Sequence, residues 1–96
     1  MIEGYITHEG TRRLEVSYLT STGLRLVDAV VTEREDEVAI HIRLETLPGG
    51  RYFFDLHRDR TTVMLQDPLR DRRVFDERGR RVKPGIPRDL RDELLD

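Results

Sequence analysis

The chain contains no cysteine and no tryptophan among its 96 residues. The absence of cysteine excludes disulfide bonds and thiolate ligands, and it argues against a structural zinc site. No apolar run approaches the roughly 18 residues that a membrane-spanning helix needs, so no membrane partner is predicted. The N-terminus lacks a basic stretch followed by an apolar run, so no secretory signal is indicated. These absences together predict a cytoplasmic protein.

Lysine is also nearly absent, since Lys83 is the only one among 17 basic residues. The excess of arginine fits either the codon usage of a GC-rich genome or selection for bidentate contacts to carboxylates and phosphates. The net charge of −2 is unevenly distributed. Residues 57–83 carry nine basic and five acidic groups, whereas residues 1–56 carry six and ten. This asymmetry indicates either a polyanion-binding face or two halves of a sheet that attract each other.

Alternation of apolar and polar residues is the main structural signal, and it predicts a β-rich protein. In the N-terminal half it predicts strands over residues 2–7, 12–19 and 24–33. Residues 1–11 also fit a flexible terminus. The alternation is disturbed around Val27 and Asp28, which indicates either a β-bulge or a strand that is covered on both faces.

Residues 38–66 have the pattern of an antiparallel meander with one buried face. Pro48-Gly49-Gly50 and Asp59-Arg60 are the predicted turns. The register that keeps apolar side chains together places Leu44 opposite Phe54 and Ile42 opposite Leu56. After the second turn it places Leu56 opposite Val63.

Asp67-Pro68 ends this meander, because proline cannot donate a hydrogen bond to a sheet. Residues 73–76 and 80–83 are predicted to form a short hairpin, and residues 84–96 a connector followed by a short amphipathic helix. The predicted fold is therefore mainly β, a single domain over residues 1–96. It is an antiparallel meander of six or seven strands, curled into a small sandwich or half-barrel, with one C-terminal helix.

Residues 62–76, TVMLQDPLRDRRVFD, are followed at residues 79–82 by GRRV. This stretch resembles the closing segment of small β-rich actinobacterial proteins of unknown function, in which a strand runs into Pro-Leu-Gly-Asp-Arg and a valine-rich hairpin. VVTE at residues 30–33 and VAI at residues 38–40 are similar to their central hairpin. Arg70 stands where those proteins usually have glycine, and their frequent cysteines are missing. The resemblance, over residues 14–82, implies a β fold and an actinobacterial or actinophage origin, but no activity.

The predicted register places His41 opposite His57 on the solvent face, where two neutral imidazoles can hold a divalent metal. Only Asp55 and Asp59 are near enough in the sequence pattern to act as further ligands, whereas zinc normally has three or four protein ligands. The pair therefore suggests a weak metal site, and a solvent-exposed or partner-facing pair is the alternative. No cofactor is predicted.

The basic segment at residues 70–83 is a candidate surface for nucleic acid or another polyanion. Alternation places Arg73 on the opposite face from Val74, and Arg81 on the opposite face from Val82. Arg80 adds a further cation. Interleaved acidic residues and scarce aromatic side chains favour the alternative, a set of self-neutralising salt links.

The remaining candidate is the solvent face of the meander, where Phe53 and Met64 lie beside Arg43. An exposed aromatic residue and a methionine next to arginine are typical of a binding patch. The alternative is that the N-terminal segment or the C-terminal helix covers this face. No nucleophile elbow, phosphate loop or metalloprotease motif is present, so no enzyme is predicted. The favoured function is a non-enzymatic binding module that uses a sheet face or strand edge, with an unknown protein or a second copy as partner.

Overall fold

The computed structural model describes residues 2–48 and 56–85, which form seven β-strands. The part of the chain that the structure describes contains no helix long and apolar enough to cross a membrane. The strands are β1 (Ile2–Thr7), β2 (Arg13–Thr20), β3 (Leu24–Glu33), β4 (Glu37–Thr46), β5 (His57–Met64), β6 (Arg73–Phe75) and β7 (Arg81–Val82).

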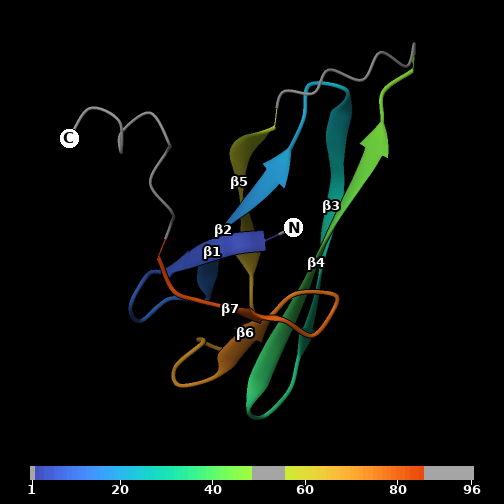
Figure 1. The fold of residues 1–96 in the computed structure, drawn as a ribbon. Coiled ribbons are helices and arrows are strands. Elements are labelled where there is room, and N and C mark those ends of the chain that lie inside the picture. Colours follow the sequence, from blue (N-terminus) through green and yellow to red (C-terminus); the bar gives the residue numbers. More distant parts are fainter. Residues whose placement is uncertain (1, 49–55, 86–96) are drawn as a thin grey trace, which may run out of the picture.

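The strands form two sheets that are joined at one corner (Figure 1). One sheet has the order β1-β2-β5 and the other the order β3-β4-β6-β7. Gly85, just after β7, donates its backbone N–H to the carbonyl of Tyr5 in β1 over 2.7 Å. This contact makes the two sheets one curled layer, whose terminal strands are β5 and β3 within the described residues.

The concave side of the curl holds the hydrophobic core. Alternate residues of β2 and β4 point into it, and Leu14, Val16, Val38 and Ile40 are fully buried. The other sheet strands complete the core, with Val63 from β5, Val74 from β6 and Val82 from β7. β-Branched residues dominate this list because they pack well on a pleated surface.

The predicted strands of the N-terminal half and the final hairpin are confirmed. The bulge is confirmed as well, because the pairing of β3 with β4 shifts register between Leu26 and Asp28. The final hairpin pairs Val74 with Val82. Its turn is closed by the Asp76 side chain, which accepts hydrogen bonds from the backbone N–H groups of Arg78 and Arg80, each 2.9 Å long.

The predicted meander over residues 38–66 is wrong in its connections. Residues 57–64 form one continuous strand, so Asp59-Arg60 is not a turn. This strand pairs with β2, with Val63 opposite Leu14, and not with β4. β4 instead pairs with β3 and, in parallel, with β6. Local turn composition is overridden here because pairing with β2 satisfies the backbone groups of both strands and places Val63 beside Leu14 on the buried face.

Two further predictions lie outside the described residues. They are the helix within residues 84–96, of which residues 86–96 are not described, and the pairing of Leu44 with Phe54. Ile42, which was predicted to face Leu56, has Ala29 as its partner in β3.

Candidate functional site

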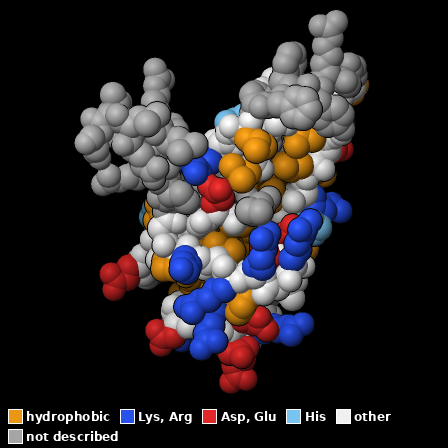
Figure 2. Space-filling view, viewed as in Figure 1, with side chains coloured by type: hydrophobic (Ala, Val, Ile, Leu, Met, Phe, Trp, Pro, Cys, Tyr) orange, Lys and Arg blue, Asp and Glu red, His pale blue; other side chains and the backbone are white. Residues whose placement is uncertain are grey.

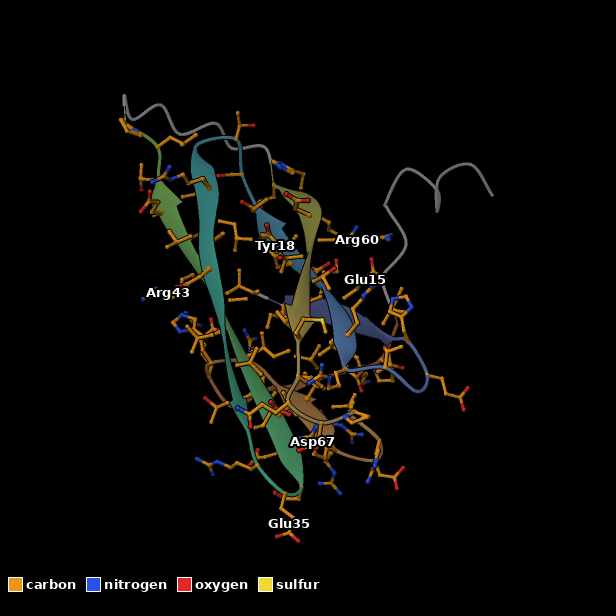
Figure 3. All side chains as sticks on the ribbon, turned by 180° about the vertical axis from the view of Figure 1, so that it is seen from behind. Glu15, Tyr18, Glu35, Arg43, Arg60 and Asp67 are labelled. Carbon is orange, nitrogen blue, oxygen red and sulfur yellow. The ribbon has the colours of Figure 1, made fainter. Side chains whose placement is uncertain are left out.

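The residues of the predicted sheet-face site do not come together in the described structure. Met64 is 60% exposed at the end of β5, and Arg43 belongs to β4 in the other sheet. Figure 3 shows Arg43 projecting from the outer side of the β3–β4 pair, whereas Arg60 of β5 projects from the opposite side of the molecule. Phe53 lies outside the described residues. The strand pairing that was expected to place Met64 beside Arg43 is therefore not formed.

The proposed histidine pair is also separated. His41 lies in β4 opposite Val30, and His57 lies in β5 opposite Thr20, in the other sheet. The pairing on which the metal-site prediction depended is wrong, because β5 joins β2 and not β4. Within residues 2–48 and 56–85, no three or more histidine, aspartate or glutamate side chains gather closely enough to hold a metal ion.

The basic residues of β6 and β7 lie where the alternation placed them. Arg73 and Arg81 are exposed, while Val74 and Val82 point into the core. Figure 2 shows Lys and Arg side chains gathered over this part of the molecule, with acidic side chains below them. Arg80 is not free, because it forms an ion pair with the buried Asp76 at 3.4 Å. The surface is therefore basic but flanked by carboxylates.

A site that the alternation only hinted at is the outer edge of β3. β3 is the terminal strand of its sheet among the described residues. It carries two large exposed hydrophobic side chains, Val27 at 47% and Val30 at 45%. Natural edge strands usually carry lysine, proline or inward-pointing charges that prevent pairing. β3 has no lysine or proline, but it carries the bulge and three charged residues, Arg25, Asp28 and Glu33. The disturbed parity at Val27 was the one sequence signal for this site.

The charges beside this edge are held by partners in the same sheet. Arg43 forms an ion pair with Asp28, and Arg25 forms one with Glu45. The hydrogen bond from Arg43 lowers the pKa of Asp28, an effect that burial partly opposes. The exposed Val27 and Val30 are therefore flanked by charged side chains that are already paired within the sheet.

The inner face of β3 is incompletely covered. Leu26, Ala29 and Val31 pack against the core but are only partly buried. Figure 2 shows hydrophobic side chains at the surface over the upper parts of β3 and β4. β3 therefore has exposed apolar side chains on its outer face and partly buried ones on its inner face.

A groove of about 1080 Å³ lies at the other end of β3, between the β3–β4 turn and the loop that leads to β6. Its floor is built by Arg72, which is 12% exposed and contacts Glu33. The Arg72 guanidinium also donates to the backbone carbonyls of Arg34, Asp67, Pro68 and Leu69. Each guanidinium nitrogen of Arg72 therefore already has a protein partner. The residues around this groove form a structural joint, in which Arg72 holds the loop before β6 against the end of β3.

Arg70 at the rim of this groove has φ +54°, in the left-handed region that favours glycine. Arg72 donates its backbone N–H to Leu69 over 3.2 Å, so Arg70 is the second residue of a tight turn. Glycine would adopt this φ without strain.

Tyr18 is the remaining titratable group of note, and it lies between the sheets beside β5 (Figure 3). Burial, together with the charge of Asp59 and a hydrogen bond to it, raises the pKa of the Tyr18 hydroxyl.

The chain matches no known protein-family model, and comparisons with curated proteins and with solved structures found no match either.

Proposed function

We propose that this protein is a non-enzymatic binding module that recognises a protein partner by main-chain pairing along the free edge of β3. The observation that carries the proposal is the pair of exposed valines, Val27 and Val30, on a ten-residue edge strand. Addition of an extended strand to such an edge supplies backbone hydrogen bonds for affinity and side-chain contacts for specificity.

The site residues support binding and not chemistry. The ion pairs of Arg25 and Arg43 present fixed polar groups around an apolar centre, as the rim of an interface does. The partly buried Leu26 and Val31 would lose further contact with water when a strand is added.

The experiment is photo-crosslinking in expressing cells, with a benzophenone amino acid placed at Val30 or, as a matched control, at Met64. Both positions are exposed and apolar, but they lie in different sheets. We expect a discrete adduct from position 30 that disappears when the V27K substitution adds an edge lysine. Adducts only from position 64 would contradict the proposal and favour the outer face of the β1-β2-β5 sheet.

A second candidate function is polyanion binding by the exposed cations of β6 and β7, which Figure 2 shows gathered on one side. A mobility-shift titration with random duplex DNA at low salt tests it. The double variant R73E/R81E should then abolish the shift, whereas R12E/R13E, with the same change in net charge, should retain it. Equal loss in both variants would indicate non-specific attraction only.

A further inference from the structure

We propose that the partner of the β3 edge is β3 of a second copy of this chain, paired antiparallel with Val27 of one copy opposite Val30 of the other. This inference rests on the proposed function and names the partner for the same edge. A two-fold dimer of this kind needs a patch that is complementary to itself, and the bulge gives β3 that property.

The bulge reverses the order of inner and outer residues at the middle of the strand. Before it, Leu26 points inward and Arg25 outward, opposite Glu45. After it, Ala29 and Val31 point inward, and Val30 lies outward opposite His41. Even-numbered residues therefore point inward before the bulge, and odd-numbered residues point inward after it. When one half of β3 pairs with the other half of the second copy, the numbers of two facing residues must add to an odd sum if inner residues are to face inner ones.

The register with Val27 opposite Val30 meets this requirement and overlaps all ten residues of β3. It places Leu26 opposite Val31 on the inner face and Arg25 opposite Thr32 on the outer face. The exception is the central pair: Asp28 of one copy lies opposite Ala29 of the other, and these two side chains point to different faces of the sheet. Since a shift by one residue would place inner side chains against outer ones, this register is the one that the strand supports over its full length.

The charges are compatible with this partner. No two like charges lie directly opposite each other, because Arg25 faces threonine, Asp28 faces Ala29 and Glu33 faces Leu24. The two Asp28 carboxylates lie diagonally at the centre of the pair, and each is neutralised by Arg43 of its own chain. The carboxylate of Glu33 is held within its own chain by the backbone N–H groups of Gln66 and Asp67. The guanidinium of Arg25 is held by Glu45. An identical edge is therefore not repelled, in contrast to a typical guarded edge strand.

Burial also favours a second copy. The partly buried Leu26 and Val31 of each chain would cover those of the other, which continues the core of one copy into the core of the next. A single strand pair gives an interface in the size range of transient complexes, below about 1,200 Å² in total. We therefore expect a dimer that forms at high protein concentration and dissociates on dilution.

Cysteine pairing tests this register directly, because the chain has no cysteine of its own. The single variants V27C and V30C are prepared separately and then mixed under mild oxidation. The mixture should form a disulfide-linked dimer several-fold faster than either variant alone. The two copies of position 27 are three residues apart along the pair, about 10 Å, which is beyond the reach of a disulfide.

A mixture of V30C with M64C, whose second thiol is on the other sheet, gives the rate of random collision. Urea midpoints of all three variants within error of the parent show that folding is intact. Faster linkage of V30C with itself than of the mixture would overturn the register and the inference with it. Linkage at the collision rate, with a monomer by sedimentation at the highest soluble concentration, would overturn the second copy as partner.

The photo-crosslinking experiment distinguishes failure of the dimer proposal from failure of the proposed function. An adduct from position 30 with another protein, and no self-association, would retain the β3 edge as a binding site but reject the second copy. No adduct from position 30 would reject the binding edge itself.

Discussion

Arg72 and Glu33 are 39 residues apart in the chain, yet the Arg72 guanidinium lies 3.3 Å from the Glu33 carboxylate in a largely buried joint. Glu33 ends β3, and its carboxylate also accepts the backbone N–H groups of Gln66 and Asp67. Arg72 completes the joint by donating to backbone carbonyls on both sides of it. The contact fixes the loop from β5 to β6 against the β3–β4 turn.

Replacement of Arg72 by lysine should destabilise the protein although it keeps the positive charge. An ammonium cannot reproduce the fork of donors that reaches Glu33 and the surrounding carbonyl groups at once. We expect R72K to lower the free energy of unfolding by about 1–3 kcal/mol, measured by urea denaturation. The matched control is R78K on the exposed turn between β6 and β7, which should change it by less than about 0.5 kcal/mol. Equal losses of unfolding free energy in R72K and R78K would show that the multiple hydrogen bonds of the Arg72 guanidinium do not contribute to stability.

The free energy of unfolding should fall in acid because of two carboxylates, those of the partly buried Glu33 and the buried Asp76. Burial raises the pKa of Glu33 and of Asp76, but backbone N–H groups and a neighbouring arginine outweigh it, so both pKa values are lowered. A carboxylate with a lowered pKa stabilises the fold above its unfolded pKa of about 4, and this contribution is lost as the pH falls through the folded value.

We therefore expect a free energy of unfolding that is nearly constant from about pH 7 to 5 and declines below about pH 4.5. D76N should be less stable at neutral pH and should show a shallower decline in acid, measured by urea denaturation at each pH. E35Q, at the exposed tip of the β3–β4 turn (Figure 3), is the control for loss of a carboxylate. An unchanged acid slope in D76N would contradict the assignment of the effect to Asp76.

Arg70 is predicted to be a site of stored backbone strain. Its φ of +54° costs an L-residue roughly 1 kcal/mol, which glycine does not incur. R70G should therefore raise the thermal midpoint despite the greater freedom that it gives to the unfolded chain. R70A, which removes the same side chain but keeps the strain, should give no increase. A gain of the same size in both variants would assign the effect to the side chain.

Ser17 offers a stabilising substitution of a different kind. The side chain is 1% exposed, and its hydroxyl has no hydrogen-bond partner among the residues that the structure describes. Since an unsatisfied buried hydroxyl costs free energy, S17A should leave stability unchanged or increase it by up to about 1 kcal/mol. Differential scanning calorimetry measures the change. A loss of more than about 1 kcal/mol would mean that the hydroxyl contributes to packing or bonding in the folded protein.

The sequence determined most of the strands, the bulge at Val27 and the final hairpin, because each depends on residues close together in the chain. Period-two alternation shows which side of a strand is buried, and the same pattern separated Arg73 from Val74 correctly. None of these signals, however, specifies which strand lies beside which.

Only the tertiary structure decided the pairing of β5 with β2 and of β4 with β6, and these pairings separate His41 from His57. Within the described residues they also leave β3 at the end of its sheet, where Val27 and Val30 are exposed. The physical reason is that strand pairing joins distant segments through backbone hydrogen bonds common to all residues. The choice among partners depends on burying the whole core at once, which no local pattern records.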